Sequence, residues 1–160
     1  MPVLSKTVKD EIRIACPADL EPLMALWLAS TTRAHPYVAA DYWQQSAQVV
    51  RESYLPRART WVYLHNGQIV GFISVLDERF VGALFVEHLF HGKGVGAALM
   101  AYVQQSHAWL SLEVYEQNLR ACGFYHKHGF RVMQRQFNQE TQAYTLIMNW
   151  ASAELQPPEP

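Results

Sequence analysis

The chain has 160 residues, of which 50% are hydrophobic and 17% charged; this matches one folded domain and excludes a disordered or fibrous protein. Thirteen basic against fourteen acidic residues give a net charge of −1, so no overall basic field attracts nucleic acid or an anionic membrane. The two cysteines, Cys16 and Cys122, are too few for a disulfide framework and form no Cys-x-x-Cys pair.

Neither a signal peptide nor a membrane span is expected. Residues 1–11 carry charges where a signal peptide needs an apolar run, and no stretch approaches the roughly 18 apolar residues that cross a bilayer. We predict a soluble, cytoplasmic protein with a single domain over residues 1–160. Its ordered core covers about residues 11–150, and the tail at 152–160 is expected to be frayed.

The first part of the chain predicts a strand followed by two helices. Residues 11–15 alternate polar and apolar side chains, as a short strand does. Apolar residues over 20–28 then recur at helical spacing, until Pro36 ends the helix. Asp41 is predicted to cap a second helix that runs to about Tyr54.

The rest of the chain predicts hairpins around one strand–helix–strand unit. Strands at 60–64 and 69–76 flank an Asn-Gly turn signal. Further on we predict strands at 80–86, 110–114, 130–137 and 143–150, a helix at 94–107 that buries Val95, Leu99, Tyr102 and Val103, and a helix at 118–128 closed by Gly129. Hairpins give antiparallel pairs, whereas the unit from 80 to 114 gives a parallel crossover. The expected fold is a mixed α/β (α+β) one, a mostly antiparallel central sheet with one parallel β-α-β junction, where ligands tend to bind.

A glycine-rich loop, His91-Gly-Lys-Gly-Val-Gly96, lies between a predicted strand and a predicted helix. Glycines let the backbone approach a ligand closely, and the free amides at a helix start attract phosphate. Lys93 adds positive charge at the same place. A Walker A loop is excluded, because Gly94 follows Lys93 where Ser or Thr must stand.

A dinucleotide-binding fingerprint fits the same loop in part. Gly92, Gly94 and Ala97 match G-x-G-x-x-A, and Glu113 follows at the distance of a ribose-binding acid. Only one clear strand–helix unit follows the loop, however, whereas a doubly wound domain needs several. A dinucleotide-binding oxidoreductase is kept as an alternative.

Two blocks of sequence resemble the GNAT superfamily of acetyl-CoA-dependent N-acetyltransferases. The glycine loop is similar to the family's [QR]-x-x-G-x-[GA], with Gly94 and Gly96 at the glycine positions and His91 at the Gln/Arg position. Residues 118–130 match N-x-x-A-x-x-[FL]-Y-x-x-x-G-F at every specified position. The resemblance covers about residues 11–150 and is greatest to small bacterial enzymes that modify lysine or have no characterised acceptor.

The resemblance implies where the cofactor would bind. The strand that ends at Leu84-Phe85-Val86 would splay from the next parallel strand, and its backbone would pair with the pantetheine arm and polarise the thioester. Besides these three, the implied cofactor-binding residues are His91, Gly92, Lys93, Gly94, Val95, Gly96, Ala97, Asn118, Ala121, Phe124 and Tyr125. Apart from the resemblance, Asn118 is an ordinary helix N-cap and Tyr125 a packed aromatic residue.

The resemblance also implies two catalytic residues. Tyr125 would protonate the departing thiolate, since a phenol stays protonated at neutral pH, and Glu113 would take a proton from the substrate ammonium. Glu78 and His35 are rival bases. We place His35 and Phe80 at the acceptor site, as part of an aromatic lining. No metal is expected, because the histidine pairs near the loop and helix lack a supporting acid or cysteine cluster.

The implied reaction is direct transfer of the acetyl group of acetyl-CoA to a primary amine in a ternary complex. The sequence leaves open whether the amine is a protein lysine, a protein N-terminus or a small molecule, and whether the enzyme is a monomer or a homodimer. A non-catalytic sensor that only binds acyl-CoA is a second alternative.

Overall fold

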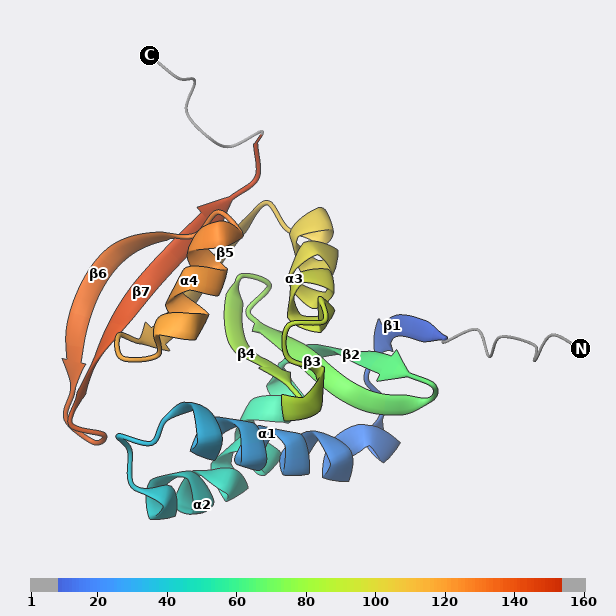
Figure 1. Ribbon diagram of the computed structural model, residues 1–160, viewed down its shortest axis with the longest axis horizontal. Coiled ribbons are helices and arrows are strands. Elements are labelled where there is room, and N and C mark those ends of the chain that lie inside the picture. Colours follow the sequence, from blue (N-terminus) through green and yellow to red (C-terminus); the bar gives the residue numbers. More distant parts are fainter. Residues whose placement is uncertain (1–8, 154–160) are drawn as a thin grey trace, which may run out of the picture.

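The computed structural model describes residues 9–153 and shows one seven-stranded sheet in the order β1-β2-β3-β4-β5-β7-β6 (Figure 1). The strands are β1 (Asp10–Ile14), β2 (Arg59–His65), β3 (Gln68–Leu76), β4 (Phe80–Val86), β5 (Trp109–Tyr115), β6 (Arg131–Asn138) and β7 (Ala143–Ala151). The α-helices are α1 (Leu20–Ala34), α2 (Ala40–Val49), α3 (Val95–Ser106) and α4 (Leu119–Lys127). Among the strands of residues 9–153, β4 and β5 form the one parallel pair, and the other neighbours are antiparallel.

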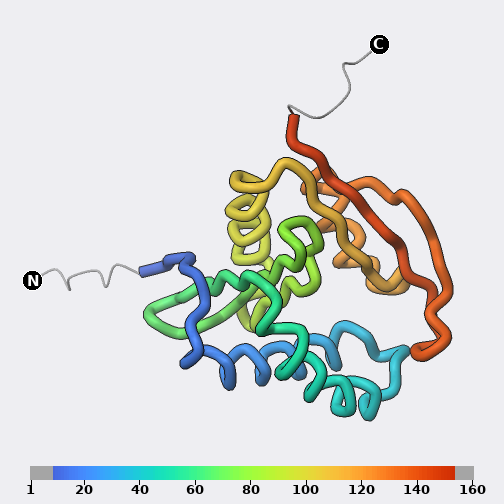
Figure 2. Tube along the Cα trace, turned by 180° about the vertical axis from the view of Figure 1, so that it is seen from behind, coloured from blue at the N-terminus to red at the C-terminus, as the bar shows by residue number. Residues whose placement is uncertain are grey.

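Helices cover both faces of the sheet. The pair α1 and α2 packs on one face, whereas α3 and α4 lie on the other (Figures 1 and 2). Side chains alternate between the two cores along each strand, so Leu112 and Val114 of β5 are buried with α3, and Tyr115 packs in the core of α1 and α2. Apolar burial on both faces is the main stabilising contribution of such a layered fold.

The sheet opens between β4 and β5. Their parallel pairing consists of Phe80 with Ser111 and Val81 with Leu112, and it stops there although both strands continue. Strands β5, β7 and β6 turn away from β2 and β3 (Figure 1). The splaying that the family resemblance implied for residues 84–86 therefore coincides with a stretch of β4 that has no partner on this side.

The predicted element order and fold class are confirmed. The hairpin turn has positive φ at Asn66 (50°) and Gly67 (81°), as the Asn-Gly signal requires. Asn118 caps α4, and Gly129 follows its end with a φ of +93°. Strand boundaries differ from the prediction by at most one residue, within the usual spread of assigned element ends.

Three details of the helices were predicted wrongly. Ala39 rather than Asp41 is the N-cap of α2; it has an extended backbone and no side-chain cap, and Asp41 lies in the first turn, where the helix dipole favours an acid. The α-helical part of the second helix ends at Val49. A π-helical turn over Val50–Tyr54 follows it directly and carries the helical run to Tyr54. Tyr102 is 40% exposed, and Met100 takes its place against the sheet.

Predictions for the two ends fall partly outside the structure. Residues 154–160 of the expected tail and residues 1–8 of the N-terminal segment are not among the described residues. Within residues 9–153, no helix combines the length and the apolar character needed to cross a membrane.

Candidate active site

Beyond Val81, backbone polar groups of β4 face the gap beside β5 and have no partner in β5. The Glu87 amide donates to the Val70 carbonyl on β3, 2.7 Å away. Because successive residues of a strand point their amides and carbonyls to opposite sides, Leu84 and Val86 direct theirs toward β5. Since β5 offers no ladder partner at this level, an extended ligand can pair with this edge as an added strand.

The glycine loop leads from this edge into α3. Gly92 and Gly94 have φ values of 77° and 85°, which glycine adopts without strain, and Gly94 is the N-cap of α3. A Cβ atom at either position would meet nothing within 4 Å, so the loop borders open space. The first amides of α3 have no partner within the helix and carry the positive end of its dipole. The loop thus fits a phosphate group.

Helix α4 begins beside the start of α3. The Asn118 Oδ1 accepts a hydrogen bond from the Ala121 amide at 3.2 Å, so the capping role expected of Asn118 is observed. A Cβ atom on Gly96 would lie 3.5 Å from the Phe124 ring, which shows how closely the two helices approach here. The predicted cofactor residues of the loop and of α4 therefore lie on two helices that pack together near the start of α3.

His91 makes its contacts within the protein. Its Nε2 donates to the Val86 carbonyl at 2.9 Å, and its Nδ1 accepts a hydrogen bond from Arg120 Nη1 at 2.7 Å. Burial lowers the pKa of His91, which favours the neutral ring that these two partners require. Both ring nitrogens of His91 are therefore engaged within the protein. Sequence reasoning missed Arg120, which occupies an unspecified position of the second family block.

Tyr125 lies on the α3–α4 face of the sheet. Its ring packs against Phe124 and Phe130, with centroid distances of 5.5 and 5.8 Å. Burial strongly raises the pKa of the Tyr125 hydroxyl, so the group stays protonated at neutral pH. A phenol that keeps its proton can donate it to a ligand.

Glu113 projects from the opposite face of the sheet, because Leu112 and Val114 on either side of it are buried with α3. Its Oε2 accepts hydrogen bonds from Thr145 Oγ1 at 2.6 Å and from Gln136 Nε2 at 3.0 Å. The residue is exposed and follows directly after the last residue of β5 that pairs with β4. Glu113 and Tyr125 thus lie on opposite faces of the sheet.

The structure separates the two predicted acceptor residues. His35 is 8% exposed, its Nδ1 lies 2.8 Å from the Thr31 carbonyl, and burial lowers its pKa. It belongs to an aromatic cluster in which its ring centroid lies 4.9 Å from that of Tyr115. Phe80 pairs with Ser111, which precedes Tyr115 on β5 by four residues, or about 13 Å along the strand. A role for either residue in acceptor binding stays a prediction.

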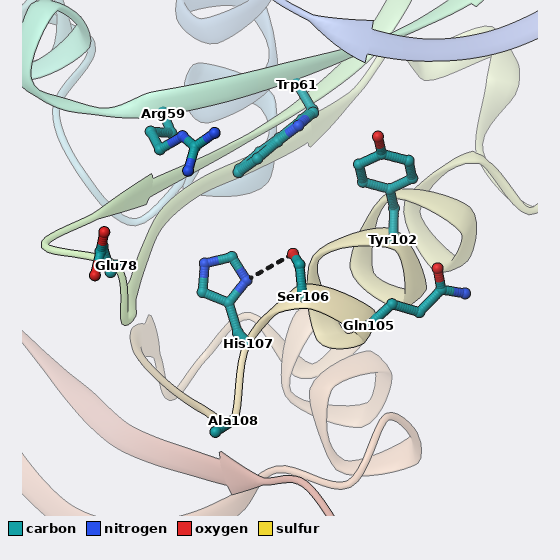
Figure 3. Close-up of a pocket in the computed structure, with 8 residues that line it drawn as sticks. All are labelled: Arg59, Trp61, Glu78, Tyr102, Gln105, Ser106, His107 and Ala108. Carbon is teal, nitrogen blue, oxygen red and sulfur yellow. Dashed lines mark hydrogen bonds between the residues drawn. The ribbon is translucent and has the colours of Figure 1, made fainter.

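The rival base Glu78 lies elsewhere. It lines a cavity of about 630 Å³ at the C-terminal end of α3, opposite the glycine loop (Figure 3). The cavity walls include Trp61, Tyr102 and His107, and Arg59 stacks over the Trp61 ring at 5.5 Å. None of the predicted cofactor residues lines this cavity, so Glu78 is not grouped with Glu113 or Tyr125.

Sequence reasoning also missed a contact at the point where the sheet opens. Gly82 is the extra residue of a β-bulge, since Val81 pairs with Val75 and Ala83 with Ser74. A Cβ atom at residue 82 would coincide with the hydroxyl of Tyr54. That hydroxyl is buried without a partner among the described residues. The π-helical turn carries Tyr54 to this place, and no sequence signal predicted such a turn.

Within the described chain, no group of three or more His, Cys, Asp or Glu residues could hold a metal ion. The features present are a strand edge for an extended arm, a phosphate-binding loop, an acid and a carboxylate on opposite sides of a gap. This arrangement fits an extended ligand that carries phosphate at one end and lies between a proton donor and a carboxylate.

Comparisons with known proteins give the class of protein. The family model described as an acetyltransferase (GNAT) domain matches residues 30–146. The chain is 42% identical over 139 residues to the peptidyl-lysine N-acetyltransferase YiaC of Escherichia coli, covering 87% of this chain and 95% of YiaC. It is 37% identical over 116 residues to YjaB of the same organism, also named a peptidyl-lysine N-acetyltransferase, covering 72% of this chain and 78% of YjaB.

Solved structures show the same fold. The solution structure of apo YjaB from Escherichia coli superposes with a TM-score of 0.77 at 31% identity, covering 91% of this chain and 99% of that one. The PaiA N-acetyltransferase from Thermoplasma acidophilum, crystallised with coenzyme A, has a TM-score of 0.74 at 18% identity, covering 90% and 99%. At that identity the second likeness concerns the fold alone.

The chain therefore belongs to the GNAT acetyltransferase family. It is an N-acetyltransferase that takes the acetyl group from acetyl-CoA and transfers it to an amine. Neither the acyl-CoA sensor nor the dinucleotide oxidoreductase is retained, since the family is enzymatic and the sheet has one parallel junction instead of a doubly wound order.

Proposed function

We propose that this enzyme acetylates lysine side chains of proteins or peptides. The names of YiaC and YjaB support this substrate class. The catalytic part rests on one observation: Tyr125 and Glu113 lie on opposite faces of the sheet, and Glu113 follows the point where the β4–β5 pairing ends. A thioester held in that gap would meet a proton donor from one side and an amine from the other.

Acetyl-CoA supplies an activated acetyl thioester. The Leu84 and Val86 amides on the open edge of β4 would hold its arm and polarise its carbonyl, as pre-organised donors do in an oxyanion hole. Gly92, Gly94 and the first amides of α3 would bind its pyrophosphate, with Lys93 adding charge. Phe124 and Ala121, which are partly buried in the core of this face, would wall the site.

Tyr125 acts as the general acid in this proposal. Its hydroxyl keeps its proton until a thiolate develops beside it, and then donates. Glu113 acts as the general base for the ammonium of the incoming lysine. Hydrogen bonds from Thr145 and Gln136 hold the carboxylate in place while it remains open to solvent on the α1–α2 face. An exposed anion also attracts a cationic side chain.

A substrate panel tests the acceptor. Each of three amines is offered with acetyl-CoA: a lysine peptide with a blocked N-terminus, a lysine-free peptide with a free N-terminus, and a polyamine. Mass spectrometry of the products should show acetylation of the lysine peptide alone or foremost. Preference for either other amine overturns the lysine proposal while leaving acetyl transfer intact. Location in the cytoplasm, and a monomeric or homodimeric state, are part of the same proposal.

A calorimetric titration of the protein without ligand tests the cofactor site. Acetyl-CoA should bind one-to-one with micromolar affinity, whereas NADH and NADPH should give no response. Dinucleotide binding without acetyl-CoA binding would mean that the residues of the glycine loop hold a different ligand.

A further inference from the structure

The cofactor loop lacks the side chain that its sequence pattern provides for pyrophosphate. His91 stands at that position, and both of its ring nitrogens are engaged, one by the Val86 carbonyl and the other by Arg120. A neutral imidazole with these partners carries no charge and offers no free donor to an anion. Lys93 adds charge within the loop, with its Nζ 5.4 Å from the centroid of the Phe90 ring. A second cation, in place of the side chain missing at position 91, has to come from another part of the chain.

We propose that Arg120 supplies this cation and that His91 is the residue that positions it. Arg120 is in the first turn of α4, beside the start of α3, and its hydrogen bond to His91 brings its guanidinium to the glycine loop. The inference rests on the proposed placement of the cofactor at the loop. It assigns the binding of pyrophosphate to a side chain of α4, a helix that follows the loop by more than twenty residues.

The charges around Arg120 favour an anion. No carboxylate among residues 9–153 lies within ion-pair distance of its guanidinium. The nearby acid Glu87 is occupied as a helix cap by the Leu89 amide at 2.8 Å. Arg120 has five N–H donors in a planar fork and spends one on His91, so the others remain available for a bidentate phosphate contact. The residue is exposed, as a ligand for a surface-bound pyrophosphate must be.

His91 fits the role of a positioning residue. Its Nε2–H is tied to Val86, whose backbone borders the gap, and its Nδ1 lone pair is aimed at Arg120. One ring therefore links the strand edge, the loop and α4, the three parts of the proposed cofactor site. A long arginine side chain loses less conformational freedom on binding when it is already held in place.

Calorimetry with three acetyl donors tests the assignment of Arg120. Acetyl-CoA contains all phosphates, acetyl-dephospho-CoA lacks the 3′-phosphate, and S-acetylpantetheine lacks the pyrophosphate and the nucleotide. Arg120→Gln should weaken binding of the first two by the same factor, roughly 10- to 100-fold for lost charge-assisted hydrogen bonds, and leave the third unchanged. Arg120→Lys should recover only part of the loss. The matched control Arg59→Gln removes an equal charge at the far end of α3 and should change nothing.

A double-mutant cycle tests the role of His91. His91→Leu should weaken acetyl-CoA binding in the wild-type background and have no further effect in the Arg120→Gln background, whereas His91→Gln, which keeps a donor and an acceptor, should retain most of the affinity. Equal effects of His91→Leu in both backgrounds would show that His91 does not act through Arg120.

Three other outcomes would overturn the inference. A loss for acetyl-CoA but not for acetyl-dephospho-CoA would move Arg120 to the 3′-phosphate. An equal loss for S-acetylpantetheine would indicate general damage to the site, and no loss at all would remove Arg120 as a ligand. Failure of the wild-type protein to bind acetyl-CoA would instead overturn the proposed cofactor site itself.

Discussion

The two faces of the sheet contribute to the gap between β4 and β5 in different ways. On the α3–α4 face, the glycine loop, the Asn118 cap and Tyr125 come from two short blocks of sequence that bring their own geometry. On the α1–α2 face, His35 and Tyr115 meet in an aromatic cluster although they are far apart in the chain. Glu113 depends in the same way on Thr145 and Gln136 from the last hairpin.

This difference shows which half of a transferase site can be predicted from the sequence. A cofactor that is the same for a whole family can be bound by local turns and helix starts, which have recognisable residues. An acceptor site is assembled from distant segments. On the α1–α2 face such segments meet where the tip of the β6–β7 hairpin approaches the α1–α2 connection (Figures 1 and 2), and Tyr42 of α2 donates a hydrogen bond to Glu140. Its chemistry is set by packing and has no linear signature.

The largest effect is expected for Tyr125→Phe on the α3–α4 face. Removing the proton donor should lower kcat by about 10²-fold or more and leave the Kd for acetyl-CoA unchanged, since the ring that packs the site is kept. Steady-state kinetics and calorimetry measure the two quantities. Tyr102→Phe, an exposed tyrosine of α3, is the control and should behave as wild type. Unchanged turnover would remove Tyr125 from the mechanism.

Glu113→Gln tests the base on the other face. The amide can still accept the Thr145 hydrogen bond, so the fold should be kept. The kcat/KM for the amine should fall by roughly 30-fold. This loss is smaller than the largest general-base effects because water can take up part of the proton transfer. The acidic limb of the pH–rate profile should change. A variant that keeps the wild-type limb would show that Glu113 is not the base. Glu116→Gln, whose acid pairs with Arg135, is the matched control.

Gly82→Ala probes the bulge where the two faces meet. The new methyl group would take the place of the Tyr54 hydroxyl, and overpacking of this kind lowers the free energy of unfolding by about 1–3 kcal/mol. Urea denaturation measures the change. Gly123→Ala adds a methyl group to α4 where nothing lies within 4 Å, and it should be neutral or slightly stabilising. An equal response of the two variants would mean that Tyr54 does not pack on Gly82.

The smallest effect is a pH dependence of stability from His35. Its pKa is lowered in the folded protein because burial disfavours the charged ring, whereas the unfolded chain takes up the proton at the ordinary pKa near 6.5. The contribution of neutral His35 to the free energy of unfolding is therefore complete above that pH and is lost as the pH falls below it. His35→Asn should reduce the slope of Tm between pH 7 and pH 5, and the exposed His126→Asn should not.

The same His35→Asn variant bears on the acceptor site. If His35 serves only the core, KM for the amine at pH 8 should stay within a factor of about two, the size of a minor change in binding free energy. A large rise in KM with unchanged Tm would support the substrate contact that the sequence predicted.

The sequence by itself determined the element order, the parallel junction, the glycine loop and the cap at Asn118. These depend on interactions between residues close in the chain, such as the alternation of strands, the positive φ of Gly94 and the Asn118 bond to Ala121. Such local rules act in the same way wherever the segment ends up. The caps and boundaries that failed, such as Asp41, are those where several start residues differ little in energy.

Only the tertiary structure decided which side chains face the ligand. It turned His91 onto Val86 and Arg120, buried His35, placed Glu78 beside a separate cavity and set Tyr54 against Gly82. Each of these outcomes depends on a partner between 5 and about 80 residues away, chosen by how whole helices and strands pack. A residue type restricts the chemistry that a position can perform, but the direction of the side chain follows from the packing around it.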